Sequence, residues 1–142
     1  MPIECFGVFT MIMEESMKKV RHIVIFKYAA AAAADQIQQV TDALAALTHK
    51  IPGIRSFEHG VNNSPEKKNL GFTHVYQFTF DDAASRDIYL EHPDHIQFQH
   101  FVGQLGILND AFVVDYKVAV AVDARRDERD APSSTCCHGR RD

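Results

Sequence analysis

The hydrophobic positions along the chain alternate between the spacing of β-strands and that of α-helices. Four stretches are rich in β-branched and aromatic residues, and they cover residues 20–28, 54–62, 71–80 and 111–118. Between the first two stretches, apolar residues recur at helical spacing up to Thr48, which predicts an amphipathic helix that starts at Asp35 or one turn earlier. Between the last two stretches, we expect two short helices, one over residues 83–90 and one that begins at Pro93.

This order of elements predicts an α+β, ferredoxin-like domain, in which a four-stranded antiparallel sheet carries its helices on one face. In the last helix, the side expected to be buried consists of Ile96, Phe98, Phe101, Val102 and Leu105. The uncovered sheet face is expected to carry Ile23, Ile25, Phe57, Val61, Val75 and Val113. An exposed apolar face of this size predicts a partner, and the simplest partner is a second copy in a two-fold dimer.

Composition and charge fit one globular domain with polar ends. Of the 142 residues, 46% are hydrophobic, which is enough for one packed core. The net charge of −4 argues against a nucleic-acid partner, which would require a basic face. No apolar run approaches the ~18–20 residues of a membrane span, so no membrane partner is expected. The domain is expected over residues 18–118, between an N-terminal extension (1–17) and a polar, disordered tail (119–142).

The three cysteines lie near the ends of the chain, where they cannot crosslink a core. Cys5, Cys136 and Cys137 therefore favour a reducing compartment, and we expect the protein in the cytoplasm, with the nucleus as an alternative. Together with His138, the tail cysteines offer three ligands for a soft metal. Because no fourth ligand lies nearby, the pattern is weak evidence for a metal site.

The candidate chemistry lies in residues 89–95, which place a phenol and two imidazoles close together. Because proline suits the first turn of a helix, one helix is expected to end near His92 and the next to start at Pro93. The turn between them would direct Tyr89, His92 and His95 toward shared space, where a phenol and an imidazole can transfer protons. The local pattern alone favours an alternative, in which His92 caps a helix and Tyr89 packs in the core.

Two further histidines lie on predicted strands. Strand alternation places His22 on the same face as Phe26, and His74 on the same face as Phe78, and both faces are expected to lie under the helices. The alternative for both is that of hydrogen-bonded histidines within the core.

Several blocks together resemble the stress-responsive dimeric α/β-barrel family. The blocks are Val20–Lys27, Ile51–Ile54, Gly71–His74, Tyr89–His95 and Val113–Tyr116, in the family's order and spacing. The resemblance spans about Lys18 to Val118. It implies a ferredoxin-like protomer that pairs face to face with a second copy as a homodimer.

The resemblance leaves the function open. The family includes stress-induced plant proteins without settled chemistry, and polyketide cyclases of the olivetolic acid cyclase type, which close a linear poly-β-ketoacyl-CoA by aldol condensation. By this resemblance, Tyr89 and His95 would be catalytic, and no cofactor would be required. Four residues would bind the substrate: His22, His74, Phe26 and Phe78. A dimer without catalysis and a site for another small apolar ligand are the other two possibilities.

Four further positions bear on the shape of the pocket or on metal binding. Leu44 stands where the cyclase has an aromatic residue in the wall of its alkyl pocket. Some family members hold a magnesium ion on backbone carbonyls, at positions that correspond to Thr48, Ile51 and Ile54. Carbonyl oxygens suit a hard cation such as Mg²⁺, and a crystallisation ion is an equally good account of those structures.

Overall fold

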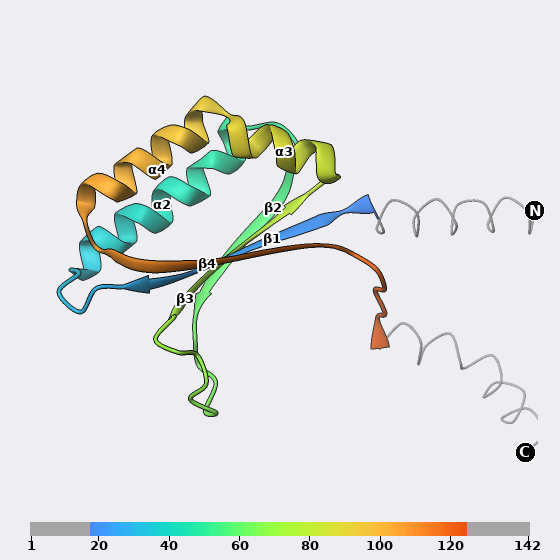
Figure 1. Cartoon of the computed structure of the whole chain (residues 1–142). Helices are drawn as coiled ribbons and strands as arrows, with labels where there is room; N and C mark the ends of the chain where they lie inside the picture. Colours follow the sequence, from blue (N-terminus) through green and yellow to red (C-terminus); the bar gives the residue numbers. More distant parts are fainter. Residues whose placement is uncertain (1–17, 125–142) are drawn as a thin grey trace, which may run out of the picture.

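The computed structural model describes residues 18–124 and contains one four-stranded antiparallel sheet. Its elements are β1 (Val20–Tyr28), α2 (Ala34–Lys50), β2 (Ile54–Val61), β3 (His74–Phe80), α3 (Ala83–Glu91), α4 (Pro93–Leu105) and β4 (Leu108–Lys117). The strand order is β2-β3-β1-β4, and the helices cover one face (Figure 1). This arrangement confirms the predicted ferredoxin-like fold. The predicted N-terminal extension and most of the predicted tail, including its two cysteines, lie outside the described residues.

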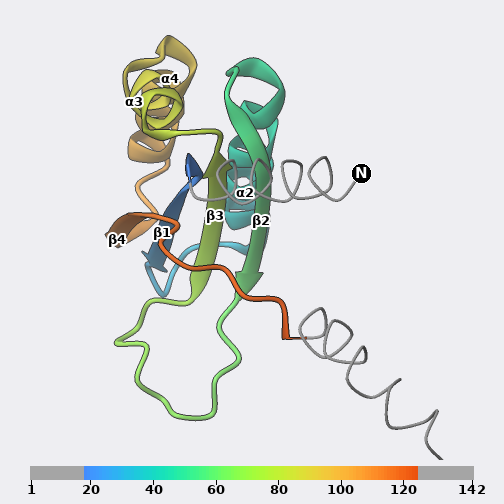
Figure 2. The ribbon, with the colours of Figure 1, turned by 90° about the vertical axis from the view of Figure 1, so that its right-hand side faces the viewer.

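The helices divide the covered face between them. Figure 2 shows α2 over β2 and β3, whereas α3 and α4 lie over β1 and β4. Within residues 18–124, no helix combines the length and the apolar content that a membrane span requires.

Local side-chain chemistry sets the start of the first two helices. The N–H of Ala33 donates to Oε1 of Gln36 at 3.0 Å, so α2 begins one residue before Asp35, which was predicted as a possible cap. The carboxylate of Asp82 accepts a hydrogen bond from the N–H of Ser85 at 2.8 Å and caps α3.

The break between α3 and α4 follows the prediction from Pro93. His92 ends α3, and its Nδ1 accepts from the N–H of Asp94 at 3.1 Å, so the same residue caps the start of α4. Gly106 ends α4 in the left-handed conformation, with φ of 63°, which glycine adopts without strain. His92 therefore has the capping role that the alternative interpretation assigned to it, at the start of α4 as well as the end of α3.

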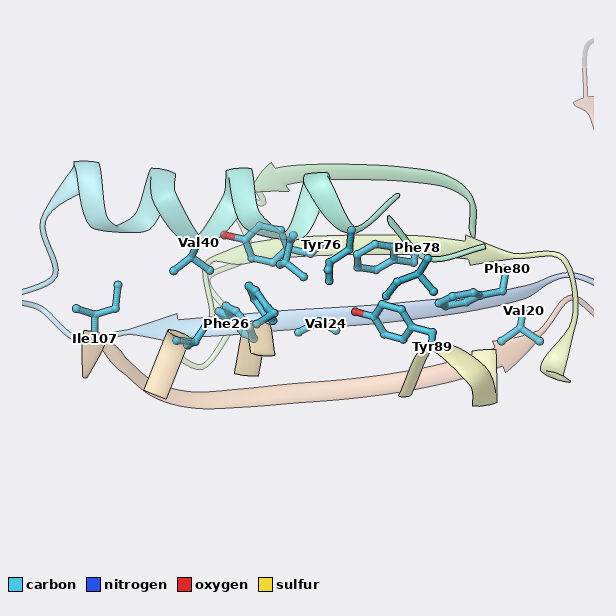
Figure 3. Packing of buried hydrophobic residues seen from close by; sticks show 14 residues of the cluster. Val20, Val24, Phe26, Val40, Tyr76, Phe78, Phe80, Tyr89 and Ile107 are labelled. Carbon is cyan, nitrogen blue, oxygen red and sulfur yellow. The ribbon is translucent and has the colours of Figure 1, made fainter. Parts of the chain in front are cut away.

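The core lies between the sheet and the helices (Figure 3). Its fully buried members include Val40, Ile51, Tyr76, Phe78, Phe80 and Tyr89. Ile96 was predicted to be buried but is 42% exposed, because the buried side of α4 runs through Phe98 and Val102. Aromatic rings contact one another within this core: Phe78 stacks on Phe80 along β3, and Tyr89 of α3 lies tilted against both.

The uncovered face of the sheet is apolar, but half of its predicted members were wrong. Directly paired residues point to the same face, and Phe57 pairs with Phe78, while Val113 pairs with Val24. Phe57 and Val113 therefore lie on the helix side. The same argument places Val61 on the helix side, because it pairs with His74. These three assignments were wrong because the pairing register between strands decides which side chains face the helices. The alternation within one strand does not reveal that register.

Pairing identifies the residues that replace them on the uncovered face. Phe112 pairs with Ile25, and Val114 pairs with Ile23, and these β4 side chains are 54% and 44% exposed. Tyr116 continues the row and is also about half exposed. A contiguous apolar surface over β1, β3 and β4 still predicts a partner chain.

We expect Val114→Asp to weaken self-association at least tenfold, because it would place an unpaired carboxylate on the sheet face where a second copy is expected to pack. Sedimentation velocity over a concentration series measures this change. Ile96→Asp is the matched control, since Ile96 is similarly exposed (42%) but lies on the helix side. Equal effects of the two substitutions would contradict the assignment of the interface to the open sheet face.

Candidate active site

A cavity of about 440 Å³ lies between α4 and the sheet strands β1 and β4. The α4 side of the cavity follows one helical face, formed by His95, Phe98, Gln99, Val102, Gly103 and Gly106. Figure 1 shows α4 running back over the sheet, so that its end meets the start of β4. Leu44 of α2 also contributes to the wall. The space between sheet and helices is therefore partly open and is not filled by the phenylalanines that line it.

The floor of the cavity consists of residues that pair across β1 and β4. Val24 pairs with Val113, and Phe26 pairs with Ala111, and all four side chains line the cavity. His22 also lines it, and four residues along a strand separate His22 from Phe26, which corresponds to about 13 Å. The cavity thus has a polar end at His22 and an apolar end at Phe26.

Tyr89 and His95 meet at the polar end because α3 and α4 join at a sharp break. Their ring centroids are 4.3 Å apart, and both side chains line the cavity. His95 Nδ1 lies 3.2 Å from the carbonyl oxygen of Leu90. Because a carbonyl only accepts, Nδ1 carries the proton in the neutral ring, and Nε2 keeps its lone pair.

Two polar atoms at this end have no hydrogen-bond partner within residues 18–124. They are the Tyr89 hydroxyl and Nε2 of His95, which take part in no hydrogen bond or ion pair with the described residues. Every fully buried side-chain nitrogen or oxygen of the described residues has a hydrogen-bond partner. Because these two atoms have none, they are not fully buried, and they are accessible from the cavity that their residues line. They are therefore available to a bound molecule.

Burial sets the protonation of both groups. It lowers the pKa of His95 below the ordinary 6.5; the hydrogen bond to the Leu90 carbonyl opposes this shift, and the neighbouring His22 adds to it. Burial also raises the pKa of Tyr89 well above its ordinary value, and the charge of Asp115 raises it further. At neutral pH the site holds an imidazole with a free lone pair beside a phenol that keeps its proton.

A chain of polar contacts holds His22, which is only 3% exposed. Its Nδ1 lies 2.7 Å from Oδ1 of Asp115, the residue paired with it across β1 and β4. Arg86 of α3 donates to the other carboxylate oxygen of Asp115 at 2.8 Å. In the neutral ring, Nδ1 donates to Asp115 and Nε2 of His22 keeps a lone pair.

Sequence reasoning did not assign Asp115 and Arg86 to the site. The available signal was Asp115, an acidic residue that follows the apolar run 112–114 and alternates in step with Val113. That signal does not identify its partner, because the pairing of Asp115 with His22 depends on strand register. Arg86 lies in another element, and its sequence surroundings carry no comparable signal.

The structure brings together four of the six residues predicted for catalysis or substrate binding: His22, Phe26, Tyr89 and His95. His74 and Phe78 face the helices as predicted but do not line this cavity. Nδ1 of His74 lies 2.8 Å from the hydroxyl of Thr73. Burial lowers the pKa of His74, and nearby His59 lowers it further by a smaller amount. Phe78 is fully buried beneath Tyr89, with ring centroids 5.3 Å apart. A role of His74 and Phe78 in substrate binding stays a prediction.

The three carbonyls predicted for magnesium belong to one connection. Thr48 lies in the last turn of α2, Ile51 caps that helix, and Ile54 begins β2. Among residues 18–124, no three side chains of His, Cys, Asp or Glu form a cluster that could hold a metal ion. Binding of magnesium by backbone carbonyls stays a prediction.

Comparison with known proteins relates the chain to one family. The family model described as Stress responsive A/B Barrel Domain matches residues 20–118. The stress-response A/B barrel domain-containing protein HS1 of Arabidopsis thaliana is 29% identical over 105 residues, which cover 74% of this chain and 94% of that protein. Olivetolic acid cyclase of Cannabis sativa is 24% identical over 79 residues, which cover 56% and 78% of the two chains.

Solved structures share the fold. A dimeric ferredoxin-like protein of unknown function from Jannaschia sp. CCS1 is 28% identical, with a TM-score of 0.61, and the match covers 70% of this chain and 99% of that chain. Hydroxynitrile lyase from Passiflora edulis, at 24% identity, has a TM-score of 0.67 over 75% of this chain and 99% of its own, which shows a common fold. These matches agree with the predicted fold, and proteins of this fold include dimers.

We expect the free energy of unfolding to rise with pH in the range below about 6.5. The pKa of His95 is lowered in the folded state, so at these pH values the unfolded chain binds more protons than the folded one. His74 contributes in the same direction. Urea denaturation between pH 5 and 7 measures the slope, and His95→Asn should reduce it. His100→Asn, an exposed histidine of the same helix, is the control, and an equal reduction in that variant would contradict the assignment.

Asp115→Ala should destabilise the protein by about 1–3 kcal/mol, because it leaves the Nδ1–H of buried His22 without its acceptor. Asp87→Ala is the matched control. Asp87 also contacts Arg86, at 2.8 Å, but its side chain is 63% exposed, so the expected change is within about 0.5 kcal/mol. Denaturant titration compares the two variants, and a similar loss in both would show that Asp115 does not support His22.

Proposed function

The chain belongs to the stress-responsive A/B barrel domain family, and on this premise we propose that it is a homodimer whose protomers each bind a small carbonyl compound. The apolar sheet face, with Phe112 and Val114 about half exposed, supports pairing of two copies. The dimeric state of a 28% identical neighbour supports it as well. The cavity on the opposite side of the sheet is the proposed binding site.

The observation that carries the proposal is the pairing of Tyr89 with His95 in the cavity wall. Nε2 of His95 is the proposed base, because Nδ1 is occupied by the Leu90 carbonyl and the ring is neutral at physiological pH. Tyr89 keeps its proton and is the proposed donor to a carbonyl or enolate oxygen. The pair supplies the two functions that removal of a proton next to a carbonyl requires.

His22 is the proposed second contact for the same oxygen or for a neighbouring carbonyl group. Asp115 fixes the orientation of the ring, and Arg86 holds Asp115 in turn. A polar group fixed in this way orients a substrate without rearrangement when the ligand arrives. None of these steps needs a cofactor.

A second candidate function is aldol cyclisation of a linear poly-β-ketoacyl-CoA, and the similarity to olivetolic acid cyclase favours it. His95 would take a proton from a methylene between two carbonyls, and the resulting enolate would be held by Tyr89. The enolate carbon would then attack a carbonyl further along the same chain and form the ring C–C bond. The alkoxide produced would receive the proton from His95, so that the ring closure neither gains nor loses atoms.

The third possibility is a stress-linked dimer that binds no substrate. In that case the cavity would have no ligand, and the histidines at its polar end would act in folding alone. Binding and turnover separate this possibility from the first two. We also propose a location in the cytoplasm or nucleus, which microscopy of the tagged full chain would test.

We expect the purified protein to convert linear poly-β-ketoacyl-CoA into ring-closed products, and His95→Ala to lower the rate about 10²–10⁴-fold. Mass spectrometry of the products measures this conversion against the spontaneous background. His100→Ala, on an exposed position of α4, is the control and should retain the rate. Circular dichroism and sedimentation should show that both variants remain folded and dimeric.

The cyclisation proposal fails if no product forms above background. It also fails if His95→Ala and His100→Ala behave alike. Binding of a carbonyl compound without turnover would leave the first proposal in place.

A further inference from the structure

We infer that the loop between β2 and β3, residues 62–73, contacts a second copy of the chain, and that the side chain of Leu70 is the anchor of this contact. Figure 2 shows the loop extending beyond the end of the sheet. Because the occupant is a second copy, the inference rests on the proposed homodimer. It adds to that proposal a contact that lies outside the sheet.

The backbone at Leu70 has a conformation that leucine rarely adopts. The N–H of Phe72 donates to the carbonyl oxygen of Asn69 at 2.9 Å and closes a four-residue turn. The two central residues of this turn, Leu70 and Gly71, have φ of 55° and 87°. Two positive φ values are the pattern of a type I′ turn, whose first central position favours asparagine, aspartate or glycine. A leucine at this position therefore strains the backbone.

The side chain of Leu70 is as unusual as its backbone. It is 80% exposed, which is the highest value among the exposed large hydrophobic side chains of residues 18–124. A leucine that stays in water contributes no hydrophobic free energy to the folding of its own protomer. Leu70 thus departs from local sequence rules in two independent ways, and such departures are expected at functional positions. What the leucine adds is apolar surface for a contact outside the protomer.

The loop continues the open sheet face without a break. A second cavity, of about 250 Å³, is lined by Leu70 and Phe72 of the loop and by Ile25, Val75 and Phe112 of the sheet. Ile25 pairs with both Val75 and Phe112, so these three side chains form one row across the open face. The rings of Phe72 and Phe112 meet edge to face, with centroids 6.2 Å apart. One apolar hollow therefore joins the loop to the surface proposed for dimerisation.

The chemistry of this hollow suits an apolar side chain. Its polar lining comes from Asn62, Lys68 and Asn69 of the loop. The two amide groups are already used within the loop, since Asn62 accepts from the N–H of Ser64 at 3.3 Å and Asn69 donates to the carbonyl oxygen of Phe72 at 2.8 Å. An apolar cavity of ~150 Å³ can hold a benzene molecule, so this one has room for a large apolar side chain.

A second copy of the chain is the occupant that fits the position of the hollow. Phe112 lines the hollow and also belongs to the open face that the proposed dimer covers. In a two-fold dimer each copy presents its own loop to the other, so the contact is made twice. A 28% identical neighbour with this fold is dimeric. Burial of Leu70 against the second copy would offset the cost of its strained and exposed position.

Leu70→Asn separates the effect of the side chain on folding from its effect on association. Asparagine adopts positive φ more readily than leucine, so the single protomer should become more stable. The dimer would lose the apolar contact twice, so self-association of the full-length protein should weaken at least tenfold. Sedimentation equilibrium measures this change. Leu70→Met keeps an apolar side chain and should associate like the wild type.

Lys67→Asn is the matched control. Lys67 is exposed, lies in the same loop and has φ of 58°, but it does not line the hollow. Lys67→Asn should relieve backbone strain and leave self-association unchanged. Val114→Asp provides a background in which the dimer is weakened. When either asparagine is added to that background, the urea midpoint should rise.

Two results would overturn the inference. One is self-association of Leu70→Asn that is as tight as that of Lys67→Asn. The other is a lower urea midpoint when Leu70→Asn is added to the Val114→Asp background, because Leu70 would then be required within its own protomer.

The proposed sheet-face dimer fails with a different signature. If Val114→Asp weakens self-association and Leu70→Asn does not, the sheet-face dimer stands and the loop contact is wrong. If Leu70→Asn weakens self-association and Val114→Asp does not, the loop contact stands and the assignment of the interface to the open sheet face fails. A wild-type protein that stays monomeric at all concentrations would overturn both.

Discussion

The register between β1 and β4 is the constraint on which the candidate site depends. It places Asp115 opposite His22 and Ala111 opposite Phe26, so the polar and apolar ends of the cavity follow from one ladder of backbone hydrogen bonds. A shift of one residue would turn both sets of side chains to the other face of the sheet. The ionic contact of Asp115 with Arg86 then connects this ladder to α3, which carries Tyr89. The geometry of the site is therefore determined first by the pairing of the sheet strands, and only then by the positions of the helices.

Burial shifts the pKa values of His95 and Tyr89 in opposite directions. Loss of water disfavours a charged imidazole and a charged phenolate alike, so His95 becomes a weaker base that is neutral, and Tyr89 a weaker acid that keeps its proton. One environment thus yields both a proton acceptor and a hydrogen-bond donor. The break at Pro93 is what allows this, because a continuous helix from α3 into α4 would not fold His95 back against Tyr89.

Periodicity in the sequence predicted the elements, their order and the face on which His22 and His74 lie, because these properties depend on a few neighbouring residues. It did not predict which face Phe57 and Val113 occupy, since that depends on pairing with a distant strand. For the same reason Asp115 was not connected to His22. Tyr89 and His95 could be predicted as a pair because a proline sits between them. The volume of the cavity depends on side chains from five separate elements, β1, α2, α3, α4 and β4, and no local pattern carries that information.

The sheet separates the surface proposed for dimerisation from the space proposed for ligands. Alternate residues of β4 serve the two sides: Val114 faces the open sheet surface, whereas Val113 and Asp115 face the cavity and its polar contacts. Substitutions on one face of a strand leave the other face largely unchanged. A dimer built on the open face can therefore persist while cavity residues such as Gly103 and Ala111 vary. The chain is similar both to a protein named for stress response and to olivetolic acid cyclase, and this physical separation would let the ligand space differ between such proteins while the open sheet face is kept.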